Sequence, residues 1–214
     1  MINRLFQNAM WGPKGNFLGN PTDDTQRSER LGWTGDVQIF CGTAYFNMDC
    51  YAFYRKYLRD LHAEQRRFGG SVPYTVPAFR MQQNGSAAWG DVATILPWMS
   101  YLYTGDKTVL EESYPYMTAW TEFMGRGSEN GLCTCELSFG DHMCVERTDS
   151  DYLANAYYLG SVRICAMAAK VLGLTDEAKK WSELAEKVLS AIRSEFFTPW
   201  GRLAIDSQTA SIYA

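Results

Sequence analysis

Two stretches of the sequence repeat one pattern, in which an apolar helical segment, a glycine and an acidic turn precede a second helical segment. The first stretch covers residues 89–103 and 107–124, with Gly105 between them, and the second begins with residues 152–172 and Gly173. Glycine often ends an α-helix in a left-handed conformation. The spacing of the two glycines, 173 − 105 = 68 residues, is too long for an ordinary helical repeat. It favours a ring of αα-hairpins, with buried helices inside and amphipathic helices outside.

The amphipathic segment after Gly173 is the clearest helix, because its apolar residues form a single stripe. The stripe consists of Trp181, Leu184, Ala185, Val188, Leu189, Ile192 and Phe196. Further helices are expected over residues 2–12, 36–46 and 49–67, and residues 208–214 have the pattern of another helix start. With about seven helices and a negligible strand signal, the chain is predicted to be all-α.

The composition limits the partners of such a chain. It has 214 residues, of which 46% are hydrophobic, enough for a sizeable core in one domain over residues 1–214. Lys and Arg number 20 against 24 Asp and Glu, the formal net charge is -4, and no basic run occurs. We therefore expect neither nucleic acid nor a membrane as a partner. The N-terminus lacks the apolar core of a signal peptide, so we expect a cytoplasmic location.

The six cysteines fall into two groups. Cys41, Cys50 and Cys165 lie within helical patterns and are expected to be small buried residues. The other group contains a Cys-x-Cys pair, and a zinc site is one interpretation of its members, Cys133, Cys135, Cys144 and the nearby His142. The spacing fits none of the usual structural zinc patterns. Because no secretion signal is seen, we expect all six thiols to be reduced.

The most charged stretch runs from Asp23 to Asp36 and combines four carboxylates, two arginines and Trp33. Pro21 precedes it and two glycines interrupt it, so we expect a shaped loop before a helix that Asp36 is placed to cap. Such a loop suits a sugar, because carboxylates and Arg bind hydroxyls while an indole covers the apolar face of a pyranose. A salt-bridged connection, with Trp33 as a packing residue, explains the same composition equally well.

This stretch resembles a motif of the bacterial α-L-rhamnosidases of glycoside hydrolase family 78, which reads close to PTDCPQRDERLGWTGD. The sequence matches the motif at Pro21-Thr22-Asp23, at Gln26-Arg27 and without a break from Glu29 to Asp36, and departs from it at Asp24, Thr25 and Ser28. Three further matches follow in family order, Trp89-Gly90-Asp91, Phe139-Gly140-Asp141 and Gln208-Thr209. The resemblance therefore covers essentially the whole chain. It implies the (α/α)6 toroid of that family, incomplete here.

The resemblance implies inverting hydrolysis of terminal α-L-rhamnosyl groups by general acid and base catalysis, with a rhamnose-containing glycoside as the substrate. Glu29 matches the family's general acid. The positions implied to bind the sugar are Asp23, Arg27, Trp33, Asp36 and Trp89, together with Asp141 and His142 of the later motif. Such an acid/base mechanism needs no metal or cofactor.

Departures from the family pattern limit this expectation. The family's general base is a Glu well beyond the Gln-Thr motif, whereas this chain ends five residues after Thr209. About seven helices are also fewer than a closed toroid of six hairpins needs. We therefore expect part of a catalytic domain, with little turnover of its own. The alternatives are a sugar-binding remnant without catalysis, or an interaction protein that self-associates through the open toroid edge.

A further departure concerns His142, which stands where the family usually has Trp. A histidine donates a hydrogen bond to a sugar but offers less area for stacking. A solvated loop histidine is an equally good interpretation of this position. The other histidine, His62, lies on a polar helix face and is expected to be solvated.

Overall fold

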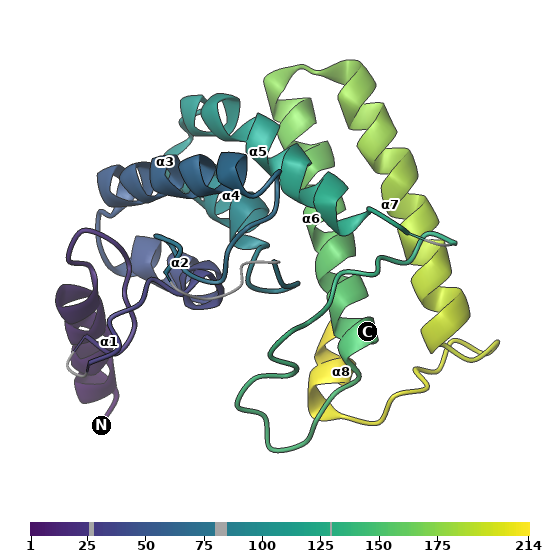
Figure 1. The fold of residues 1–214 in the computed structure, drawn as a ribbon. Helices are drawn as coiled ribbons and strands as arrows, with labels where there is room; N and C mark the ends of the chain where they lie inside the picture. Colours follow the sequence, from purple (N-terminus) through teal and green to yellow (C-terminus); the bar gives the residue numbers. More distant parts are fainter. Residues whose placement is uncertain (26–27, 80–84, 129) are drawn as a thin grey trace.

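The computed structural model describes residues 1–25, 28–79, 85–128 and 130–214 (Figure 1). Within these ranges the chain forms eight α-helices and no β-strand, only isolated bridges between single residues. The helices are α1 (Ile2–Asn16), α2 (Thr34–Asn47), α3 (Tyr51–Arg67), α4 (Val92–Thr104), α5 (Thr108–Met124), α6 (Ser150–Leu172), α7 (Thr175–Phe196) and α8 (Gln208–Tyr213). The prediction of an all-α chain is confirmed.

The helices alternate between an inner and an outer layer. In the inner layer α2 packs on α4, α4 on α6, and α6 on α8, in the order of the chain. The outer helices cover this arc, because α3 packs on α4 and α5, α5 packs on α4 and α6, and α7 packs along α6. The result is an arc of αα-hairpins of the kind that builds an (α/α)6 toroid, as predicted (Figure 1).

Two hairpins turn at the glycines that predicted them. Gly105 ends α4 with a φ of 72° and donates its N–H to the carbonyl oxygen of Tyr101 at 2.7 Å. Gly173 ends α6 with a φ of 74°. Both angles lie in the left-handed region, which costs a residue with a Cβ about 1–2 kcal/mol. These glycines let the chain reverse, so that α5 returns along α4 and α7 returns along α6.

The core lies between the two layers. Its largest fully buried side chains include Trp120, Trp181, Tyr54, Tyr57 and Tyr152. The indole N–H of Trp181 donates to the Tyr114 hydroxyl at 3.1 Å, so this polar group has a partner inside the core. The predicted stripe of α7 faces the core, and the predicted burial of three cysteines is also confirmed, for Cys41, Cys50 and Cys165.

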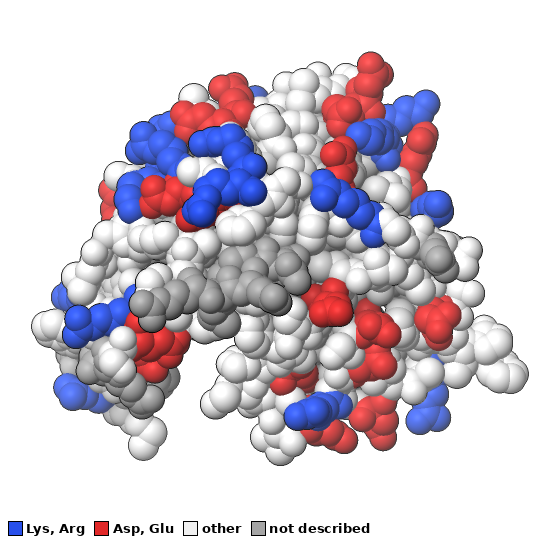
Figure 2. All heavy atoms as spheres, viewed as in Figure 1, with Lys and Arg blue, Asp and Glu red and all other residues white. Residues whose placement is uncertain are grey.

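Charged side chains form mixed clusters on the face drawn in Figure 2, where acidic and basic residues are interspersed over α3 and the start of α7. On α3, Lys56 pairs with Asp60 at 2.6 Å, and on α7, Lys180 pairs with Glu122 of α5 at 3.5 Å. Exposed ion pairs of this kind contribute only about 0–1 kcal/mol each to stability. The packing of the two layers therefore dominates the stability of the fold.

The first two helices begin or end differently from prediction. α1 continues through Pro13 to Asn16 instead of ending at residue 12. In this last turn the Asn16 side chain donates to the carbonyl oxygen of Gly12 at 2.9 Å. α2 begins at Thr34, so Asp36 lies in the first turn and its side chain does not cap the helix. There its negative charge still favours the helix N-terminus.

The prediction that His62 is solvated is wrong. Its side chain is only 6% exposed and stacks on Tyr116 of α5, with ring centroids 3.9 Å apart. Burial and, to a lesser degree, the nearby Arg66 guanidinium together lower the pKa of His62 to about 3. The helix face that looks polar in sequence is the face on which α3 packs against α5.

Apolar side chains remain exposed where the arc begins. They include Leu5 and Phe6 of α1 and Ile39 and Phe46 of α2. Among the described helices, none combines the length and the apolar character needed to cross a membrane.

Candidate active site

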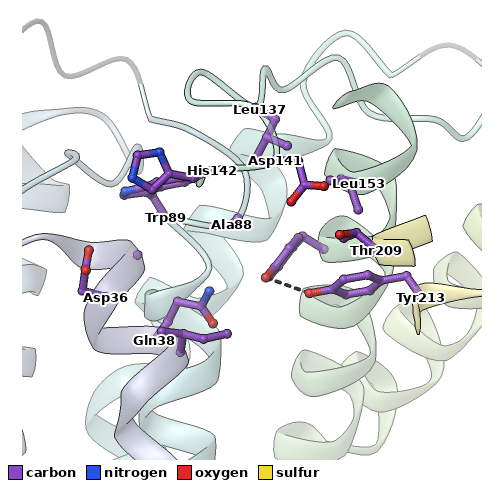
Figure 3. A pocket seen from close by; sticks show the side chains of 14 residues that line it. Asp36, Gln38, Ala88, Trp89, Leu137, Asp141, His142, Leu153, Thr209 and Tyr213 are labelled. Carbon is purple, nitrogen blue, oxygen red and sulfur yellow. Dashed lines mark hydrogen bonds between the residues drawn. The ribbon is translucent and has the colours of Figure 1, made fainter. Parts of the chain in front are cut away.

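A cavity of about 290 Å³ lies among the start of α2, the turn before α4, the loop between α5 and α6, and the helices α6 and α8 (Figure 3). Four of the residues expected to bind a sugar line this cavity: Asp36, Trp89, Asp141 and His142. Small-molecule pockets usually measure about 300–1,000 Å³. The volume therefore suits a ligand the size of a single sugar ring.

Asp36 also lines a neighbouring cavity of about 330 Å³ between α1 and α2, together with Asp23. The pKa of the Asp36 carboxyl is raised above its usual value, first by the loss of surrounding water and then by the negative charge of Asp23. Glu29 acts in the same direction, and His142 acts in the opposite one. These effects require all three groups to lie within electrostatic reach of Asp36. Three predicted carboxyl groups and His142 thus converge at the start of α2.

The charge-rich loop takes its shape from residues 74–76, which run beside it. Thr34 N–H donates to the carbonyl oxygen of Tyr74 at 2.9 Å, and Val76 N–H donates to that of Gly32 at 2.8 Å. A Cβ on Gly32 would lie only 2.3 Å from the carbonyl oxygen of Val76, so this close approach requires glycine. The loop is therefore held at its C-terminal end, directly before α2.

A series of aromatic rings connects Glu29 to the cavity wall. Trp33 donates its Nε1–H to a carboxylate oxygen of Glu29 and packs edge-on against Phe139, with ring centroids 5.6 Å apart. Phe139 also contacts Trp89 at 4.7 Å and His142 at 6.3 Å between centroids. Residues from three separate segments thus share one aromatic cluster. Glu29 and Trp33 do not line the cavity, and Phe139 connects Trp33 to the two rings of its wall, Trp89 and His142.

The place of Trp89 in this wall depends on two glycines. A Cβ on Gly35, in the first turn of α2, would lie 2.7 Å from the indole Nε1 of Trp89. A Cβ on Gly90 would lie 2.2 Å from the ring of Trp120 in the core. The turn before α4 can therefore lie close to α2 and to Trp120 of α5 only because Gly35 and Gly90 carry no side chain.

Polar groups face the cavity from the side of α6 and α8 (Figure 3). The Oδ2 atom of Asp141 is buried and has no hydrogen-bond donor among the described residues. Nearby, the Tyr213 hydroxyl donates to the Tyr157 hydroxyl at 2.9 Å. A buried carboxylate oxygen without a donor is costly, so the Asp141 side chain has hydrogen-bonding capacity left to offer in the cavity that it lines. The cavity thus combines an aromatic wall with hydrogen-bond acceptors for hydroxyls.

Sequence reasoning missed several residues of the site. Phe139 of the aromatic cluster and Thr209 of the cavity lining both belong to the matched motifs, so a sequence signal exists for both. Gln38, Tyr157 and Tyr213 line the cavity without any motif. Tyr157 is embedded in the apolar run of α6, where nothing in the local pattern separates a cavity residue from a core residue. Only the packing of α2, α6 and α8 brings these three side chains together.

Two other expectations concern residues around the site. Arg27, expected to bind the sugar, lies outside the residues that the structure describes. Burial raises the pKa of the Cys133 and Cys135 thiols to about 12, so both are protonated in the metal-free chain. Within the described ranges, no group of three or more His, Cys, Asp or Glu residues is placed to hold a metal ion. The geometry gives the zinc interpretation no support.

Comparison with known families agrees with this geometry. Residues 1–214 match the family described as the bacterial alpha-L-rhamnosidase 6 hairpin glycosidase domain. The chain belongs to this family. The resemblance of the charge-rich loop to glycoside hydrolase family 78 is thereby confirmed.

Individual rhamnosidases show how much of such a protein the chain represents. It is 37% identical over 207 residues to an alpha-L-rhamnosidase of Alteromonas sp. (strain LOR), covering 92% of this chain and 22% of that protein. It is 35% identical over 213 residues to one of Streptomyces avermitilis, covering 99% and 20%. The chain therefore spans about a fifth of the length of these relatives.

Solved structures of rhamnosidases share the same arrangement of helices. The alpha-L-rhamnosidase of Aspergillus terreus superposes with a TM-score of 0.92 at 30% identity, over 99% of this chain and 26% of that chain. The enzyme of Streptomyces avermitilis, solved in complex with L-rhamnose, also gives a TM-score of 0.92, at 32% identity, over 99% of this chain and 20% of that chain. The arc of hairpins is thus a rhamnosidase toroid segment.

Proposed function

We propose that the protein containing this chain is an α-L-rhamnosidase that removes terminal α-L-rhamnosyl groups from glycosides with inversion at the anomeric carbon. The observation that carries the proposal is the convergence of Asp23, Glu29 and Asp36 beside a cavity with an aromatic wall. The relative solved with L-rhamnose supports the choice of sugar. Carboxyl groups around an aromatic surface are the arrangement that recognises and cleaves a pyranoside.

In this proposal Glu29 is the general acid, which protonates the glycosidic oxygen as the bond to the sugar breaks. The Trp33 indole, which donates to Glu29, fixes the direction of its carboxyl group. Asp23 and Asp36 accept hydrogen bonds from hydroxyls of the rhamnosyl ring, and the Trp89 indole covers its apolar face. Asp141, which also lines the cavity, accepts a further hydroxyl.

An inverting reaction also needs a carboxylate base, roughly 6.5–9.5 Å from the acid, which activates a water on the opposite face of the sugar. Asp36 and Asp141, the carboxylates that line the cavity of about 290 Å³, are assigned to sugar binding. We therefore place the base outside residues 1–214. The isolated chain should bind rhamnose weakly and hydrolyse rhamnosides far more slowly than the whole protein.

The experiment uses the full-length protein and an aryl α-L-rhamnoside. Proton NMR of the first product formed should show β-L-rhamnose, the anomer expected from inversion. Glu29→Gln should lower kcat for a poor leaving group by about 10²–10⁴-fold, because the contribution of a general acid is of this size. The matched control is Glu136→Gln, at an exposed position of the loop between α5 and α6. Unchanged activity in Glu29→Gln would contradict the assignment of the acid, and release of the α-anomer would contradict inversion.

A further inference from the structure

A buried carboxyl group accepts a hydrogen bond from the turn that carries Trp89. Asp91, which precedes the first residue of α4, has an exposed fraction of 0%. Its Oδ2 accepts the backbone N–H of Ala88 at 2.8 Å, and its Oδ1 accepts the hydroxyl of Ser161 from α6. Burial raises the pKa of Asp91 to about 6, so at neutral pH the group is a carboxylate that accepts from both donors. A buried charge of this kind persists only where hydrogen bonds compensate its loss of water.

The donor at Oδ2 belongs to a strained residue. Ala88 has a φ of 67°, in the left-handed region that a residue with a Cβ rarely adopts. Such conformations persist where surrounding contacts impose them, and they often occur at functional sites. Here the contact is the hydrogen bond from Ala88 to Asp91, and the residue that follows Ala88 is Trp89. The bond therefore acts on the backbone directly before Trp89.

The same turn also supports the loop that brings the other cavity residues. Ala87 N–H donates to the carbonyl oxygen of Glu136 at 2.9 Å, and Ser138 N–H donates to Ser86 Oγ at 3.0 Å. These bonds link the turn to the segment that leads into Phe139 and Asp141. On the core side, Ser161 Oγ shares a hydrogen bond with Thr94 Oγ1 at 2.7 Å, so the network joins α4 to α6.

We propose that Asp91 is a positioning residue, which holds the Ala88 turn in its left-handed conformation and thereby fixes the Trp89 indole in the cavity wall. Ser161 supports Asp91 from α6. Asp91 does not face the cavity, so its effect on the ligand passes through Trp89. The expected effect on KM rests on the proposed rhamnosidase function, whereas the expected effect on the Trp89 ring does not.

The structural test follows the Trp89 ring without any substrate. The full-length protein is labelled with 5-fluorotryptophan, and its ¹⁹F resonance for Trp89 is assigned with Trp89→Phe. Asp91→Asn keeps the size of the side chain but replaces one acceptor by an amide, and Ser161→Ala removes the donor on the other side. Both should shift or broaden the Trp89 resonance. Ser161→Ala keeps the test valid if Asp91→Asn does not fold.

The matched control is Ser100→Ala. Ser100 is also buried in α4 and donates to the carbonyl oxygen of Leu96 at 2.8 Å, but it has no contact with the turn. The Ser100→Ala variant should have a lower melting temperature and an unchanged Trp89 resonance. If Asp91→Asn or Ser161→Ala lowers the melting temperature as Ser100→Ala does, with the Trp89 resonance unchanged, Asp91 is a structural residue only and the inference is overturned.

The kinetic test separates this inference from the proposed function. Because Trp89 covers the sugar in the bound state and in the transition state alike, its displacement should raise KM by about 3- to 10-fold and change kcat by less than about 3-fold. A fall in kcat at constant KM would overturn the positioning role. If the wild-type protein hydrolyses no rhamnoside, the proposed function fails, and the ¹⁹F experiment still decides the role of Asp91.

Discussion

The Trp33 indole donates its Nε1–H to the Glu29 carboxylate, so one of the two aromatic residues expected to bind the sugar also holds the expected acid. The two residues are four positions apart, in a loop whose C-terminal end is fixed by bonds to residues 74–76. A carboxyl group on an unsupported loop would sample many directions, and a small misplacement of a catalytic group can cost about 10²-fold in rate. The indole therefore contributes to the geometry of proton transfer as well as to sugar contact.

Trp33→Phe should separate these two contributions. The phenyl ring keeps the edge-on contact with Phe139 but cannot donate to Glu29. We expect kcat to fall by about 10-fold for a rhamnoside with a poor leaving group, and less for an activated aryl rhamnoside that needs little protonation. Steady-state kinetics of both substrates checks this result. Trp98→Phe, on α4 and away from the cavity, is the control. Equal losses for the two substrates would contradict a role in orienting the acid.

Gly35→Ala should displace Trp89. The new Cβ would lie 2.7 Å from the indole Nε1, and a rigid ring cannot bend away as a flexible side chain can. We expect a loss of about 1–3 kcal/mol of stability and weaker binding of rhamnose. Gly42→Ala, on the same helix, is the control, because its Cβ would meet only the mobile end of Met99 at 3.1 Å. Thermal melting and calorimetric titration with rhamnose measure both effects. Similar results for the two variants would contradict a steric role for Gly35.

His142→Trp and His142→Ala decide between the two interpretations of this residue. His142 is exposed at the cavity, and its ring centroid lies 5.8 Å from that of Trp89. A larger ring at this position should add stacking worth about 0.5–1.5 kcal/mol and lower KM by about 2- to 10-fold, whereas alanine should raise KM. The measurement is KM for an aryl rhamnoside. If neither variant changes KM, His142 is a solvated loop residue without contact to the sugar.

His62 should make the fold sensitive to acid. Its pKa is about 3 in the folded chain, against about 6.5 for an unperturbed histidine, so below pH 6.5 the unfolded state binds a proton that the folded state does not. Stability should therefore fall as the pH falls, by about 2 kcal/mol between pH 7 and pH 5. Urea unfolding at both pH values should show this loss in the wild type and a smaller one in His62→Phe. Tyr116→Phe keeps the stacked ring and the histidine, so its stability should still fall between pH 7 and pH 5 as in the wild type. An equal loss in His62→Phe would exclude His62 as its cause.

The parts of the fold that could be predicted are those with a local cause. Gly105 and Gly173 end helices through their own backbone freedom, and the stripe of α7 follows from helical periodicity alone. The charge-rich loop was recognisable because its residue types and spacing are those of a known motif. For that reason the sequence alone predicts roles for Asp23, Glu29 and Asp36.

The parts that could not be predicted depend on contacts between helices. His62 is buried because α3 packs on α5, and nothing within α3 indicates which of its faces is covered. Tyr157 and Tyr213 reach the cavity from α6 and α8, which are brought together only by the inner layer. The preference of Asp for the N-cap predicts Asp36 at that position, whereas α2 begins earlier, with Trp33 at the N-cap and no side-chain capping bond.

The position of Phe139 affects how this site responds to amino-acid substitutions. Its ring contacts Trp33, Tyr74, Trp89 and His142, which come from four different segments of the chain. Effects of substitutions add when sites share no partner and fail to add when they do. Substitutions among these four residues should therefore show strong epistasis through Phe139, and an altered sugar preference should be reached only by changing several of them together.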